Sequence, residues 1–155
     1  MKSLVVYYSR TGNTRKIALE IAVALNADIE EITDTENREG VLGYLKSGMQ
    51  SSLKKQVEIH KPEKDPSKYD LVVLGTPIWS WKLIPPLRTY INDHKFLKNV
   101  AFFCTEQGSG GKGAFKEMES MIGIKPLAKI EIFQKDLKDN VYEKRLTTFI
   151  KKLSR

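Results

Sequence analysis

The hydrophobic positions of the chain fall into two patterns. Three continuous apolar runs of strand length lie at residues 3–8, 70–76 and 100–105. Such runs are typical of strands that are buried on both faces of a parallel sheet. Two further segments, 27–33 and 128–134, alternate apolar with charged residues. Each of these two is predicted to be a strand with one wetter face, at an edge of the same sheet.

Apolar residues at spacings of three and four lie between and after these strands. The stripes begin at Ile17, Ile84, Phe115 and Tyr142, and this spacing predicts amphipathic helices. Strands that alternate with helices favour a doubly wound, five-stranded parallel sheet in three α/β/α layers. Segment 35–69 gives no clear prediction before the strand at 70–76.

Length and composition indicate a single domain over residues 1–155. The chain is 41% hydrophobic and 29% charged, which is typical of a globular protein. No apolar run approaches the roughly 20 residues of a spanning helix, and the amino terminus lacks a signal-peptide core. We therefore expect a cytoplasmic protein without membrane insertion. The single cysteine, Cys104, is expected to be a buried strand thiol.

The formal net charge of +7 raises the question of an anionic partner. Lysines are scattered, and the pairs 54–55 and 151–152 lack the interleaved aromatic residues that stack on single strands. We therefore expect no nucleic-acid binding. A basic surface of this kind helps to attract anionic cofactors or acidic partners.

Ligands of doubly wound sheets bind beyond the carboxyl ends of the strands. The loops after the three continuous apolar runs are SRTGNT (9–14), GTPIWSW (75–81) and TEQGSGG (105–111). These loops are the candidate functional segments.

The first loop has more hydrogen-bond donors than a turn requires. Either Asn13 or Thr14 is expected to cap a helix whose first N–H groups attract an anion. Gly12 lets the backbone come close, and Arg10 adds charge. No Walker pattern is present in the chain. The loop therefore predicts a phosphate site with side-chain donors at Ser9, Thr11, Asn13 and Thr14.

The third loop contains a GxGxxG pattern at Gly108, Gly110 and Gly113, with Glu131 about 20 residues after it, as in dinucleotide-binding sites. A dinucleotide fold, however, places this pattern after its first strand and needs several further strand and helix units. Only one predicted strand and helix follow here. We interpret the glycines instead as a loop whose backbone can approach a flat ligand.

The middle loop carries two tryptophans, Trp79 and Trp81, around Ser80. One alternative is that either indole lies in the core. The other is that at least one lies at the cleft and provides a wall for a ring. A phosphate loop, an indole and a glycine-rich loop together describe a site for an aromatic ring on a phosphorylated tail.

At these motifs the chain resembles the flavodoxin family, small proteins that bind FMN and carry electrons. SRTGNT is similar to the family's Ser-x-Thr-Gly-Asn-Thr phosphate loop. The resemblance implies strand order 2-1-3-4-5, an isoalloxazine packed on Trp79, and third-loop amides facing the pyrimidine edge. Segment 39–48 resembles a stretch of some small flavodoxin-like proteins and is expected to border the flavin. The implied cofactor-binding residues are Ser9, Arg10, Thr11, Gly12, Asn13, Thr14, Thr76, Pro77, Ile78, Trp79, Thr105, Gln107, Gly108 and Gly110.

Three features depart from the family pattern. Arg10 replaces a usual small hydroxyl residue, the third loop has no tyrosine or tryptophan, and the chain is basic where most flavodoxins are acidic. The second flavin face is then expected to be uncovered. A basic protein also favours the anionic reduced cofactor, which argues against a carrier of very low potential.

Two functions remain open at this stage. The first is an electron carrier that exchanges electrons with a redox partner protein, with no catalytic side chain and no metal. The second is an FMN enzyme that reduces a quinone or another small-molecule acceptor with NAD(P)H or a protein as donor. A phosphoacceptor receiver domain is excluded, because Tyr7, Tyr8 and Ser9 stand where an acidic cluster is required.

Overall fold

A five-stranded parallel sheet forms the centre of the computed structural model, which describes residues 1–35, 49, 57–96 and 98–154. The strand order is β2-β1-β3-β4-β5, as the resemblance implied. All of segment 39–48, which is expected to border the flavin, lies outside the described residues. The strands are β1 (Ser3–Tyr7), β2 (Asp28–Glu31), β3 (Leu71–Pro77), β4 (Asn99–Glu106) and β5 (Lys129–Phe133).

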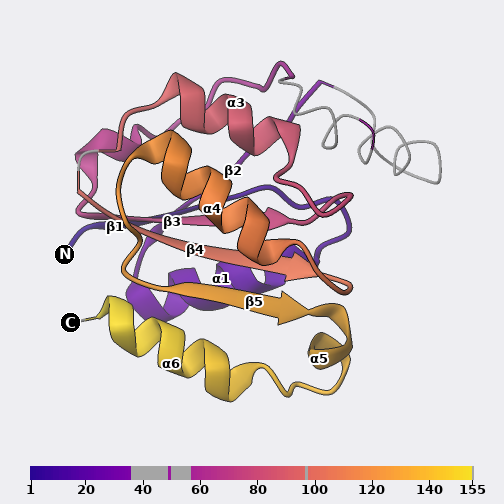
Figure 1. The fold of residues 1–155 in the computed structure, drawn as a ribbon. Helices are drawn as coiled ribbons and strands as arrows, with labels where there is room; N and C mark the ends of the chain where they lie inside the picture. Colours follow the sequence, from indigo (N-terminus) through magenta and orange to yellow (C-terminus); the bar gives the residue numbers. More distant parts are fainter. Residues whose placement is uncertain (36–48, 50–56, 97, 155) are drawn as a thin grey trace.

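Helices cover both faces of the sheet (Figure 1). Helices α3 and α4 pack side by side on one face, and α1 and α6 pack on the other. This arrangement confirms the predicted three layers. No helix among the described residues is long and apolar enough to cross a membrane. The helical segments are α1 (Asn13–Leu25), η1 (Pro66–Lys68), α3 (Pro85–Asp93), α4 (Gly111–Ile122), α5 (Gln134–Lys138) and α6 (Glu143–Leu153).

Alternate residues of the central strands enter two separate cores. Leu4, Leu74 and Phe102 pack beneath α3 and α4. Val5 and Phe103, their neighbours along the strands, pack against α1 and α6. Because both faces are buried, the side-chain alternation of a strand produces no polar face, and this explains the continuous apolar runs.

The two edge strands were also predicted correctly. Both β2 and β5 lie at the edges of the sheet. Buried and partly or fully exposed residues alternate in β5, whereas in β2 only Glu30 is buried, and all five residues of β1 are buried. Cys104 on β4 is fully buried and reduced, and burial raises the pKa of its thiol well above the ordinary value. The prediction of a buried strand thiol is thus confirmed.

Gly75 gives a test of how tightly the sheet packs. A Cβ atom at Gly75 would lie 2.0 Å from Cζ of the buried Phe103 ring. We expect Gly75→Ala to lower the free energy of unfolding by about 1–3 kcal/mol, because overpacking forces the ring and backbone to shift. Urea denaturation measures this change.

Gly113→Ala is the matched control. Gly113 lies inside α4, and a Cβ atom there would meet nothing within 4 Å. The same substitution should therefore stabilise the protein slightly, by about 0.5–1 kcal/mol through helix propensity. Similar losses for both variants would show that the Phe103 contact is not what makes Gly75 necessary.

Candidate functional site

The loops that follow β1, β3 and β4 surround one cavity of about 390 Å³ at the carboxyl ends of the strands. This is where the sequence placed the site. Four residues of the predicted set, Ser9, Gly12, Thr76 and Gly110, lie outside its lining. The structure brings these predicted residues together along the wall: Arg10, Thr11, Asn13, Thr14, Pro77, Ile78, Trp79, Thr105, Gln107 and Gly108.

The amino end of α1 lies at this cavity, and its N-cap residue supplies no side-chain cap. The helix begins at Asn13 and its N-cap is Gly12, with φ at 99°, so the prediction that Asn13 or Thr14 caps the helix is wrong. Ser9 Oγ accepts hydrogen bonds from the N–H groups of Gly12 at 3.1 Å and Arg15 at 3.3 Å. No acceptor for the N–H groups of Asn13 and Thr14 is found among the described residues. Unpaired amides at a helix amino end favour an anion.

Two arginines, Arg10 of the first loop and Arg15 of α1, lie near the start of α1. Arg10 lines the cavity. The guanidinium of Arg15 instead donates to Glu31 at 2.6 Å and to the Tyr7 hydroxyl at 3.3 Å, at the end of β2. Of the two, Arg10 is the one that lines the cavity.

A buried hydrogen bond joins the first and third loops. The hydroxyls of Thr14 and Thr105 lie 2.7 Å apart, and both residues are almost fully buried. Thr76 is also buried, but its hydroxyl donates to the Pro77 carbonyl at 2.7 Å and does not reach the cavity. The Thr14–Thr105 bond therefore fixes the start of α1 against the end of β4.

The two tryptophans of the middle loop differ in exposure. Trp79 lines the cavity but is only 4% exposed, and its ring packs edge-on against Tyr8 at a centroid distance of 5.5 Å. Trp81 also lines the cavity and is 68% exposed. The larger free indole surface is thus that of Trp81, not of the residue predicted from the family pattern.

A strained turn presents Trp81. Ser80 and Trp81 both have positive φ, at 47° and 60°, and Lys82 N–H closes the turn on the Trp79 carbonyl at 3.0 Å. Two consecutive positive values are typical of type I′ turns, which favour glycine and asparagine. Other residues pay roughly 1–2 kcal/mol each for this conformation. Such strain is common at functional sites.

The third loop packs directly on this turn through Gly110. A Cβ atom at Gly110 would lie 2.6 Å from Trp81 Cα and 2.8 Å from Ile78 Cγ2, and its φ is 116°. A glycine is therefore required at position 110, because any side chain there would collide with the middle loop. Gly108, in contrast, lines the cavity and has open space around it, as expected of a glycine that leaves room for a ligand.

Sequence reasoning missed several residues of the cavity wall. Ser80, Ser109 and Gln134 line it, and so does Glu106, a carboxylic acid that is only 2% exposed. The sequence feature that could have indicated Glu106 is its position as a charged residue directly after the apolar run 100–105. Tertiary burial of this residue was not visible in the sequence.

Glu106 lies behind the third loop, between the cavity and β5. Its carboxyl group accepts a hydrogen bond from Gly111 N–H at 3.3 Å, and the Cys104 thiol lies 3.9 Å away. Burial, and then the neighbouring carboxyl of Glu131, raise the pKa of Glu106 to about 7. Glu106 therefore holds a proton at mildly acidic pH.

Glu106→Gln should flatten the pH dependence of stability. The pKa of Glu106 rises from an ordinary value of 4.5 to about 7 on folding. The folded state then binds the proton more tightly than the unfolded state. The stabilisation that results is complete below the unfolded pKa and is lost as pH rises through 7. As pH rises from about 5 to 8, the free energy of unfolding, measured with urea, should fall more for the wild type than for Glu106→Gln.

Glu58→Gln is the control, because Glu58 is exposed. This variant should keep the wild-type slope. If Glu106→Gln also keeps it, the carboxyl of Glu106 titrates normally and the assignment is wrong.

Comparison with known proteins agrees with this fold. The family model for flavodoxin matches residues 2–152. No curated protein matches the chain. Two similar structures are a flavoprotein from Bacteroides uniformis (27% identity, 86% of this chain and 90% of that one, TM-score 0.73) and flavodoxin 2 from Bacillus cereus (20%, 99% and 98%, TM-score 0.59).

A third similar structure is that of a flavoprotein from Lactobacillus acidophilus in complex with FMN. It is 22% identical, covers 89% of this chain and 97% of its own, and has a TM-score of 0.70. At this identity the likeness shows the fold. The match of the family model over nearly the whole length shows that the chain belongs to the flavodoxin family.

Proposed function

We propose that this protein binds FMN in the cavity between the three loops and serves as an electron-transfer protein. The observation that carries the proposal is that one cavity contains both unpaired amides at a helix amino end and an exposed indole. These are the two groups that a phosphorylated tail and a flat ring require. The Lactobacillus acidophilus flavoprotein of the same fold was crystallised with FMN, which supports the choice of ligand.

The phosphate would be held by the first loop. Thr11, Asn13 and Thr14 line the cavity, and the N–H groups of Asn13 and Thr14 with the side chains of Thr11 and Asn13 would serve as donors. Arg10 adds a positive charge there. Backbone amides and a helix dipole stabilise a phosphate without any proton transfer.

The ring system would lie between the middle and third loops. Trp81 provides an exposed aromatic face, and its strained turn is fixed by Gly110. Gln107 and Gly108 of the third loop also line the cavity. We therefore assign the stacking face to Trp81, with Trp79 as the buried support behind the turn.

Bound FMN would supply the redox chemistry by taking up and releasing electrons, and the protein supplies binding and electrostatics. The net charge of +7 favours the negative charge that reduction adds to the site. Glu106 keeps a neutral carboxyl behind the third loop below pH ~7, so it adds no opposing charge there. The redox partner of such a carrier is proposed to be another protein or a small acceptor.

The phosphate assignment is tested by comparing FMN with riboflavin, which lacks the phosphate. Thr11→Ala combined with Asn13→Ala should weaken FMN by about 10- to 100-fold, since hydrogen bonds to a charged group are lost. Riboflavin should change by less than about threefold. Quenching of flavin fluorescence measures both dissociation constants.

Trp81→Ala provides the contrasting control. Loss of an aromatic face should weaken FMN and riboflavin by similar factors, because the ring system is common to both. Trp81→Phe should restore most of the affinity. If the loop variant weakens both ligands equally, the phosphate does not bind at the start of α1.

An FMN-dependent oxidoreductase is the second candidate function. It is favoured by the third loop, which lines the cavity with Gln107, Gly108 and Ser109 and no aromatic side chain. A cofactor face left open on that side would admit a small acceptor such as a quinone.

Stepwise reduction of the FMN-loaded protein distinguishes the two functions. We expect two separate one-electron steps in the absorption spectrum, and little oxidation of NADH or NADPH when a quinone is added. A single two-electron step with rapid NAD(P)H oxidation would favour the oxidoreductase and contradict the carrier.

A further inference from the structure

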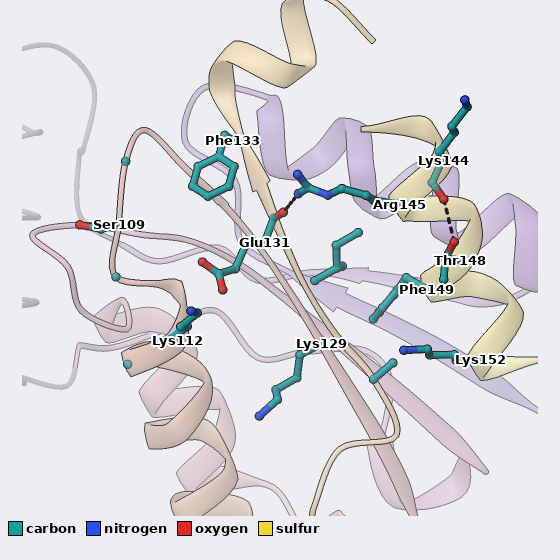
Figure 2. A pocket seen from close by; sticks show the side chains of 15 residues that line it. Ser109, Lys112, Lys129, Glu131, Phe133, Lys144, Arg145, Thr148, Phe149 and Lys152 are labelled. Carbon is teal, nitrogen blue, oxygen red and sulfur yellow. Dashed lines mark hydrogen bonds between the residues drawn. The ribbon is translucent and has the colours of Figure 1, made fainter. Parts of the chain in front are cut away.

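A second hollow lies beside the edge strand β5. This groove, with a volume of about 830 Å³, is bordered by α4 and α6 (Figure 2). Its volume lies in the range of roughly 300–1,000 Å³ that is usual for small-molecule sites. Gly108 and Ser109 line both the groove and the loop cavity, so the two hollows share the third loop.

The floor of the groove is apolar. Ala128, Ile130 and Phe149 are each at least nine-tenths buried, yet their edges line it, and Phe133 is partly exposed at one end. A hydrocarbon or aromatic body that covers these edges would gain burial of apolar surface at roughly 25 cal/mol per Å². The floor alone therefore favours an apolar ligand.

The walls of the groove are strongly basic. Lys112 of α4 and Lys152 of α6 line it on opposite sides (Figure 2). No ion pair is found for either lysine among the described residues. Their positive charges are thus not neutralised within the part of the chain that the structure describes.

The other basic side chains of the groove are either engaged with other groups or turned away from it. Lys129 pairs with Glu119 at 3.7 Å, and Arg145 pairs with Asp136 at 3.2 Å and donates to the Glu131 carbonyl. The ammonium group of Lys144 points away from the groove (Figure 2). Glu131 is the carboxylate among the lining residues, and it lies beside Glu106. The balance of charge at the groove is therefore positive.

We propose that this groove binds a small organic anion that has an apolar body and at least one carboxylate, sulfonate or phosphate group. The body covers the floor beside β5, and the anionic group pairs with Lys112 or Lys152. The site differs from the loop cavity, because its apolar lining comes from β5 and α6. The proposal does not depend on FMN binding.

A second copy of this chain fits the groove poorly. In a two-fold dimer the same patch faces itself, so the basic side chains of one copy would face those of the other. Like charges in such an interface are unfavourable. The edge strand β5 has only one strand neighbour, but Arg145 already bonds the Glu131 carbonyl on its open side. An added strand would have to displace this arginine.

Anilinonaphthalene sulfonate is a suitable probe, and phenylnaphthylamine is its uncharged counterpart. Isothermal titration of the protein, with and without saturating FMN, should give one sulfonate site that persists when FMN is present. Lys112→Gln with Lys152→Gln should weaken the sulfonate by about tenfold or more, and the amine by less than about twofold. Lys61→Gln with Lys95→Gln makes the same charge change at exposed positions outside the groove and should leave both probes unaffected.

A matched pair of α6 variants tests the location. Thr148 lines the groove and Thr147 does not, although both are exposed and both hydroxyls donate to the carbonyl four residues earlier. Thr148→Trp should fill the groove and abolish sulfonate binding. Thr147→Trp should bind like the wild type. Circular dichroism confirms that both variants are folded.

Several results would overturn the proposal. One is sulfonate binding that stays unchanged in Lys112→Gln with Lys152→Gln or in Thr148→Trp. Another is equal affinity of the wild type for the sulfonate and the uncharged amine. A glutamate hexapeptide that binds more tightly than the sulfonate, with the same variant dependence, would assign the groove to an acidic protein segment. A dimer in sedimentation that Thr148→Trp dissociates would assign it to a second copy. Absence of FMN binding would leave the groove result intact and contradict only the proposed function.

Discussion

The structure depends on burial of the parallel sheet on both of its faces. Alternate side chains of β1, β3 and β4 enter separate cores under α3 and α4 or under α1 and α6. Each crossover must therefore return across a face, and the carboxyl ends of all strands meet at one edge. The three loops lie together for this reason, although they are far apart in the sequence. The packing is close enough that a Cβ atom at Gly75 would collide with Phe103.

The loop cavity combines stable and strained backbone. The Thr14–Thr105 hydrogen bond fixes the start of α1 against β4, and Gly110 fixes the third loop against the turn that carries Trp81. These contacts over-determine the loops and so maintain positive φ at Ser80 and Trp81. A preformed site needs less ordering when a ligand binds, and this improves affinity.

The two hollows differ in the groups that would attract an anion. In the proposed FMN site these groups are backbone amides and Arg10. In the proposed groove site they are Lys112 and Lys152 above an apolar floor. The third loop separates the two, and behind it Glu106 lies against Glu131 with a raised pKa. Because this loop lines both hollows, a ligand in the groove would contact the same backbone that closes the loop cavity.

The sequence by itself determined the strands, the layers, the edge strands and the loops that line the cavity. Continuous apolar runs of strand length favour a sheet covered on both sides, and SRTGNT places excess donors where a helix begins. It did not determine the helix cap, because capping by Gly12 instead of Asn13 or Thr14 depends on local backbone geometry. Only the tertiary structure decided that Trp81 is exposed while Trp79 is buried, and that Glu106 and Glu131 meet. Exposure and pKa depend on neighbours distant in sequence, such as Tyr8 for Trp79, and no local pattern records those contacts.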